Sequence, residues 1–123
     1  MDPEWLLRTR FSAGAIIHAG EAFYDIPTAL AAVSFCEGHD LAVSGMEGVL
    51  IDDEGVQPQL EYIANFSRHP GPNWAETLRE WDGGAQEVLR QWSKECPALH
   101  VTFTVISREE WESEADADGT GVR

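Results

Sequence analysis

The feature that most constrains the fold is an apolar stripe that runs without interruption from Trp74 to Trp92. Its members recur at alternating steps of four and three residues, the spacing of one face of an α-helix: Trp74, Leu78, Trp81, Ala85, Val88 and Trp92. The stripe keeps its register across Gly83 and Gly84, although two glycines inside a helix cost about 2 kcal/mol relative to alanines. We therefore predict one helix over residues 74–95, with any kink placed at the glycines, rather than two helices in different registers.

The segment that follows this helix has the pattern of a half-covered β-strand. Over residues 99–106 the sequence LHVTFTVI is rich in β-branched residues and places Leu99, Val101, Phe103 and Val105 on one face. The other face is mostly polar. A sheet with one apolar face is covered by helices on one side only, so the chain needs two layers.

Shorter elements precede the long helix. The predicted elements, in chain order, are strands at 15–18 and 21–24 around an Ala-Gly turn, a helix at 26–37, a strand at 41–52 interrupted at 44–48, and a helix at about 57–66. The N-terminal 14 residues give no clear pattern. The fold class is therefore α/β (α+β): a two-layer sandwich in which a mixed β-sheet carries helices on one face, with the long helix before the last strand.

The length of 123 residues fits one domain. We expect residues 1–112 to form it and residues 113–123 to be an acidic, disordered tail.

Charge restricts the class of partner. The chain has 22 acidic and 8 basic residues, and residues 1–107 alone have 16 acidic and 6 basic. Such an excess repels nucleic acid and membrane surfaces and attracts basic proteins. The N-terminus lacks the basic start and apolar core of a secretory signal, so we expect a cytoplasmic protein, and the preference for Arg over Lys fits a GC-rich bacterial gene.

Five residues are the candidates for contact with a basic partner. Asp52, Asp53 and Glu54 form an acidic loop, and Glu61 lies on the helix predicted next to it. A solvated turn is the simpler interpretation of the loop. Trp111 lies among acidic residues beyond the last strand, where it is either an exposed anchor for the partner or a lid packed back on the helical layer.

Two cysteines and two histidines have spacings that a zinc site could use: Cys36-x-x-His39 and Cys96-x-x-x-His100. Packing of Cys36 in the core, with His39 in a turn and His100 on the polar side of a strand, explains these residues more simply. A cysteine nucleophile with a histidine base can be assembled only on paper, because no motif fixes such a pair. We therefore predict no enzyme activity, no cofactor and no metal.

Glu47 is the single carboxylate singled out by its surroundings. It lies between Gly45 and Gly48 inside the strand predicted at 41–52, where a bulge can redirect a side chain. A buried glutamate held by backbone donors is the favoured interpretation. An acid–base role would need a second group, which the sequence does not identify.

The segment LAVSGMEGVLIDDEGVQPQLEYIANFS, followed by a Trp-led helix and a final strand, resembles small single-domain bacterial proteins grouped with toxin-neutralising immunity proteins. The resemblance covers about half the chain and implies a non-enzymatic protein that binds one toxin domain. Immunity proteins do not share one residue set, so it assigns no functional residues.

The sequence thus predicts an acidic binding protein that neutralises a basic, nuclease-like toxin. Two alternatives stay open: a self-associating accessory or scaffold protein, and a small Cys/His metal-binding protein.

Overall fold

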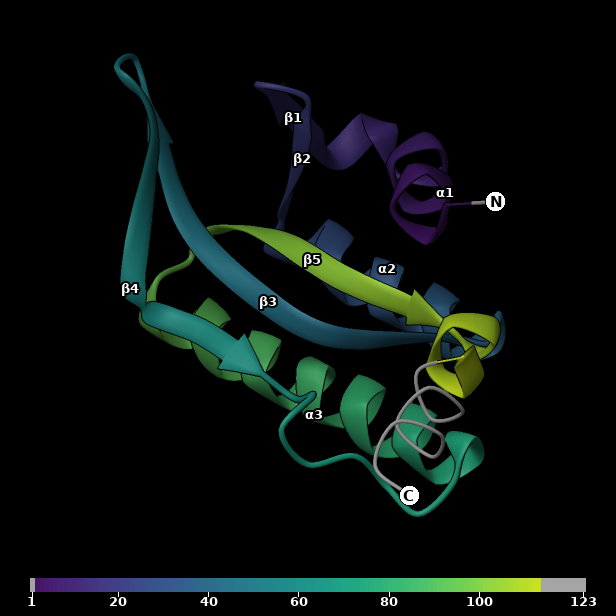
Figure 1. Cartoon of the computed structure of the whole chain (residues 1–123). Helices are drawn as coiled ribbons and strands as arrows, with labels where there is room; N and C mark the ends of the chain where they lie inside the picture. The colour runs from purple at the N-terminus through teal and green to yellow at the C-terminus, as the bar shows by residue number, and fades with distance from the viewer. Residues whose placement is uncertain (1, 114–123) are drawn as a thin grey trace.

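The computed structural model describes residues 2–113, which form one sheet with helices (Figure 1). The elements in chain order are α1 (Pro3–Arg10), a 3-10 turn η1 (Ser12–Gly14), β1 (Ala15–His18), β2 (Glu21–Asp25), α2 (Ile26–Gly38), β3 (Leu41–Asp52), β4 (Gly55–Asn65), α3 (Trp74–Glu95) and β5 (His100–Ser107). Residues 108–113 are helical as well. The predicted disordered tail lies outside the described residues except for residue 113.

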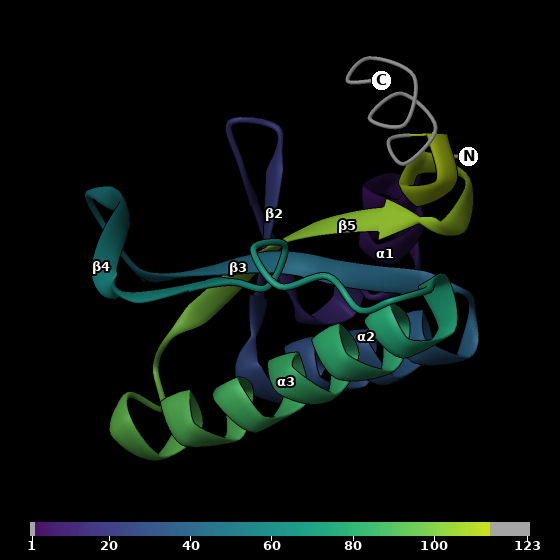
Figure 2. The ribbon, with the colours of Figure 1, turned by 60° about the horizontal axis from the view of Figure 1, so that its bottom comes forward.

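The strand order is β1-β2-β5-β3-β4, and α2 and α3 lie together under one face of this sheet (Figure 2). The predicted α/β class and the long helix before the last strand are confirmed. The sheet, however, is antiparallel at every pairing rather than mixed. The reason is that β5 inserts between β2 and β3, so the two strands joined by α2 run parallel to each other without being neighbours.

The long helix is continuous, as the apolar stripe predicts. Asn73 caps it by accepting a hydrogen bond from the Glu76 N–H at 2.9 Å. A Cβ added to Gly84 would lie 3.1 Å from a ring carbon of Phe66, whereas one added to Gly83 would meet nothing within 4 Å. Gly84 therefore allows the end of β4 to approach α3, while Gly83 does not have this role.

The helix predicted at about 57–66 is wrong, because residues 57–65 belong to β4. The β3–β4 register shifts so that Glu47 pairs with Ile63 and Val49 pairs with Pro58, which leaves residues 59–62 opposite a single residue of β3. This insertion interrupts the alternation of the strand and gives its apolar residues a helix-like spacing. Leu60, in the inserted stretch, is 83% exposed.

Helix α1 occupies most of the N-terminal stretch, residues 1–14, in which no pattern is clear from the sequence. Asp2 caps it by accepting a hydrogen bond from the Glu4 N–H at 3.1 Å, and Leu7 is buried in the main core. Asp25 caps α2 in the same way, by accepting a hydrogen bond from the Thr28 N–H at 2.9 Å.

Candidate functional site: the open face of the sheet

The face of the sheet opposite α2 and α3 carries a row of four side chains from four strands. Glu47 on β3 is the register partner of Ile63 on β4 and of Thr102 on β5. The Thr102 hydroxyl donates a hydrogen bond to Glu21 Oε1 of β2 at 3.1 Å, which extends the row to the next strand. We call these residues, Ile63, Glu47, Thr102 and Glu21, the cross-strand row.

A hollow of about 350 Å³ lies over the cross-strand row and over a second row beside it. The second row consists of the register partners Asn65 on β4, Gly45 on β3 and Thr104 on β5. Gly45 has no side chain, so the surface is depressed at the middle of the second row. A Cβ added to Gly45 would approach only the Ala64 carbonyl oxygen, at 3.3 Å. The open face is therefore concave at its centre.

The charge in this hollow has one sign. Its charged lining residues are Glu21 and Glu47, and no lysine or arginine lines it. Over residues 2–113, the ion pairs are Arg79 with Glu76 and Arg108 with Glu112, both on helix surfaces away from the hollow. The two glutamates of the cross-strand row are thus not neutralised by the described part of the chain.

A second hollow, of about 330 Å³, adjoins the first and shares Glu21, Thr102 and Phe103 with it. It lies between α1, the β1–β2 hairpin and β5, and Trp5, which is 52% exposed, forms part of its wall. Burial, followed by repulsion from other carboxylates, raises the pKa of Glu4 in this wall; those carboxylates are Asp2, Glu21 and Glu110. The acidic character of the open face therefore continues to the N-terminal helix.

Arg8 is the basic residue in the wall of this second hollow, and it is held by a backbone group. Its guanidinium donates a hydrogen bond to the Gly20 carbonyl oxygen at 2.9 Å, at the turn of the β1–β2 hairpin.

The acidic loop predicted as a contact site forms the β3–β4 turn, and all three of its carboxylates are exposed. Asp52 accepts a hydrogen bond from the Glu54 N–H at 2.8 Å, the local turn contact expected of the simpler interpretation. Glu61 is exposed on the strand β4, and not on a helix as predicted. These residues line neither of the two hollows, so the structure does not bring them together with the cross-strand row.

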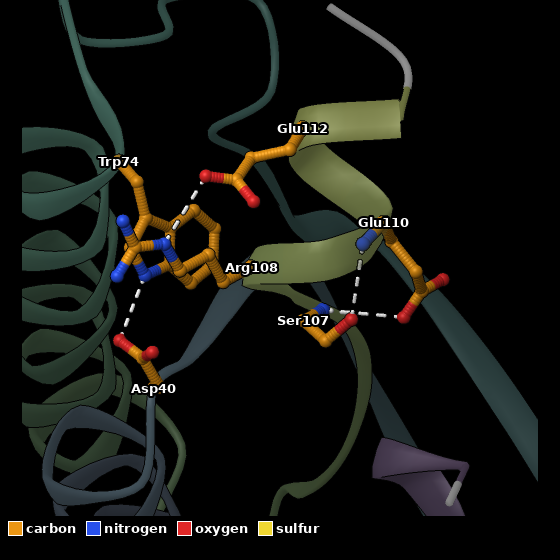
Figure 3. Close-up of polar contacts among 6 residues, drawn as sticks. All are labelled: Asp40, Trp74, Ser107, Arg108, Glu110 and Glu112. Atoms are coloured by element: carbon orange, nitrogen blue, oxygen red, sulfur yellow. Dashed lines mark hydrogen bonds and ion pairs between the residues drawn. The ribbon is translucent and has the colours of Figure 1, made fainter.

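Trp111 packs back onto the protein. Ser107 and Glu110 form a capping box at the start of the helical residues: the Ser107 N–H donates to Glu110 Oε1 at 3.2 Å, and the Glu110 N–H donates to Ser107 Oγ at 3.1 Å (Figure 3). The Trp111 ring then lies 5.9 Å from that of Trp74. Trp74 itself donates to Asp40 at 2.8 Å. The half-buried Trp111 therefore packs as a lid on the smaller core cluster, which is the second of the two predicted alternatives.

The cysteine and histidine pairs do not assemble. Cys36 is fully buried, and burial raises the pKa of its thiol to about 12, so it is not a thiolate near neutral pH. The His39 ring stacks on Phe35 at 3.9 Å and its Nδ1 makes a 2.8 Å hydrogen bond with the Phe35 carbonyl oxygen. In residues 2–113, no three His, Cys, Asp or Glu side chains are grouped as metal ligands would be.

Glu47 is exposed on the open face, so its interpretation as a buried structural glutamate is wrong. The irregular strand predicted from the glycines on either side of Glu47 is present. The β3–β5 register shifts before Glu47, and the β3–β4 register shifts after it. Glu21 and Ile63 were missed altogether: their proximity to Glu47 depends on the strand order and on the placement of 57–66 in a strand.

Comparisons with protein-family models, with curated proteins and with solved structures find no match for this chain. Among the helices that the structure describes, none is long and apolar enough to cross a membrane.

Proposed function

We propose that this protein is a non-enzymatic binding protein that covers a basic surface of a partner protein. The observation that carries the proposal is the concave open face of the sheet, whose two charged side chains, Glu21 and Glu47, have no basic partner in the described residues. A partner that supplies arginine or lysine there would pair both carboxylates and cover the exposed face at once.

The class of protein we propose is a toxin-neutralising immunity protein of a bacterial cell. The resemblance of the 41–67 segment supports this class, and so does the net charge of −14, since nuclease toxins present basic clefts. Blocking such a cleft needs shape and charge and no catalytic group.

Charge on the β3–β4 turn has a separate role in this proposal. Asp52, Asp53 and Glu54 are exposed at the β3–β4 turn and Glu61 is exposed further along β4. These four acids would attract a basic partner over distances of about 10 Å, the screening length at moderate salt. Long-range attraction raises the association rate more than it raises the affinity of the final complex.

The proposal is tested by affinity capture followed by an activity assay. The full chain is immobilised, exposed to lysate of the source cells at low salt, and eluted with rising salt into a mass spectrometer. A captured basic protein is then produced in purified form. The proposal predicts a defined complex with this chain and loss of the toxin's activity on its substrate. Full activity of every captured protein in the presence of excess chain would refute it.

A second candidate function is self-association, favoured by the β1 edge of the sheet. Within residues 2–113 this strand has no neighbour on its outer side, and its Ile16 and Ile17 are 41% and 47% exposed. An apolar edge strand is a template for pairing with another chain. Sedimentation equilibrium over a range of concentrations tests it: a mass that stays at 13.6 kDa would exclude this candidate.

A further inference from the structure

We infer that the cross-strand row, and not the β3–β4 turn, is the centre of the interface, and that it receives an arginine side chain flanked by an apolar residue of the partner. This inference rests on the proposed function and names the chemistry of the contact.

The two carboxylates of the cross-strand row lie on either side of Thr102. Glu47 is the register partner of Thr102 on one side, and Glu21 accepts the Thr102 hydroxyl hydrogen bond on the other. A guanidinium above Thr102 would have a carboxylate on each side. Arginine has five N–H donors in a planar fork, so it can serve two carboxylates at the same time, whereas the ammonium of lysine is a compact point charge.

The surface beside the two carboxylates is hollowed and partly apolar. Ile63 is 52% exposed next to Glu47, and the missing side chain of Gly45 leaves depth beside it. An apolar side chain next to the arginine would cover Ile63 and fill this depth. Apolar contact at the centre with charge pairing around it is the usual anatomy of a protein interface.

The two carboxylates of the cross-strand row lie on strands that are paired on both sides or hydrogen-bonded to a neighbour. The backbone of Glu47 is paired to a strand on each side, and the Glu21 carboxylate accepts the hydrogen bond from Thr102. The acids of the β3–β4 turn are exposed at the tip of a hairpin, where pairing a side chain with a partner costs conformational entropy and the charge is screened. We therefore expect the carboxylates of the cross-strand row to contribute more to the bound complex than those at the tip.

The test is an NMR titration of the ¹⁵N-labelled full chain with a blocked peptide in which arginine and leucine alternate. The inference predicts the largest amide shifts at Glu21, Glu47, Thr102 and Thr104. The double variant Glu21→Gln/Glu47→Gln keeps an oxygen that can accept the Thr102 hydrogen bond. It should weaken peptide binding by about fivefold or more, the effect of losing two partly desolvated charge contacts.

The matched control is Asp53→Asn/Glu54→Gln, which removes the same charge from the turn and spares Asp52, whose carboxylate holds the turn. It should change peptide binding by less than about twofold. Shifts centred on residues 52–54, or a control variant that binds more weakly than the open-face variant, would overturn the inference.

Failure of the inference and failure of the function are distinguishable. If a toxin is neutralised and the Glu21→Gln/Glu47→Gln variant neutralises it as well as the native chain does, the inference is wrong and the function stands. If the peptide maps to the open face and no purified toxin is inhibited, the surface is correctly identified and the proposed function is wrong.

Discussion

Asp82 on α3 accepts a hydrogen bond from the backbone N–H of Val43 on β3 at 2.8 Å, inside the core. The contact lies where the β3–β5 register shifts, between Val43 and Gly45, so the carboxylate joins the long helix to the irregular part of the strand. Its other oxygen is buried without a hydrogen-bond partner among the described residues. Burial, together with the nearby charge of Glu37 and against the lowering effect of the Val43 N–H, raises the pKa of Asp82 to about 7.

This raised pKa predicts an unusual dependence of stability on pH. The folded state holds the Asp82 proton up to about pH 7, whereas the unfolded chain releases it near the ordinary value of 3.8. The folded state therefore binds more protons between these values, and the free energy of unfolding falls as pH rises through this window. A difference of about three pKa units corresponds to a penalty on the order of 4 kcal/mol above pH 7.

Asp82→Asn should remove most of that penalty, because it keeps an oxygen for the Val43 N–H and carries no charge. We expect the variant to be more stable than the native chain at pH 8 and to have a flatter stability profile between pH 5 and 8, measured by urea unfolding. Glu80→Gln, at an exposed position of the same helix, is the control and should leave the profile unchanged. If the free energies of unfolding of the native chain and of Asp82→Asn changed in parallel with pH, Asp82 would not be the source of the pH dependence.

The two adjacent glycines of α3 should respond differently to alanine. Gly83→Ala adds a Cβ that meets nothing within 4 Å and should stabilise the protein by about 1 kcal/mol, the helix propensity difference. Gly84→Ala places a Cβ 3.1 Å from the Phe66 ring and should lose some or all of that gain. Thermal unfolding of both variants checks this, and equal stabilisation would show that Phe66 does not need Gly84.

Trp111→Ala should lower stability and leave partner binding intact. The ring packs on Trp74 and is half-buried, so its removal should cost about 1–2 kcal/mol, less than for a fully buried tryptophan. Urea unfolding measures the loss, and titration with the captured partner measures the affinity. A stable variant with strongly weakened binding would restore Trp111 as an interface anchor.

Association with a basic partner should slow steeply with salt. Between about 0.05 and 0.5 M salt, screening of the exposed acids should lower the association rate at least tenfold, while the dissociation rate changes much less. Stopped-flow mixing measures both rates. An association rate that is independent of salt would exclude electrostatic steering by the turn residues.

Patterns that depend on one element alone were predictable from the sequence. The apolar stripe from Trp74 to Trp92 determined α3, and alternation in 99–106 indicated β5. The β4 strand was not predictable in this way, because the insertion at 59–62 shifts its alternation and creates a helical spacing. The capping box of Ser107 and Glu110 is a local sequence signal for the start of the helical residues 108–113, which are not among the predicted elements.

The open face could be predicted only in part. The alternation of β5 indicated one polar, uncovered face, and the glycines around Glu47 indicated an irregular strand. The cross-strand row needed the strand order as well, because it joins residues from four strands that are far apart in the chain. Long-range pairing of this kind leaves no local pattern in the sequence.

The most direct test of the central claim compares two double charge reversals against the captured partner. Glu21→Lys/Glu47→Lys alters the open face, and Glu80→Lys/Glu87→Lys makes the same change in net charge at exposed positions of α3. The account predicts that calorimetric titration will show at least about a hundredfold loss of affinity for the first variant and less than about tenfold for the second. Equal losses for the two variants would mean that only net charge matters, and would contradict the open face as the binding surface.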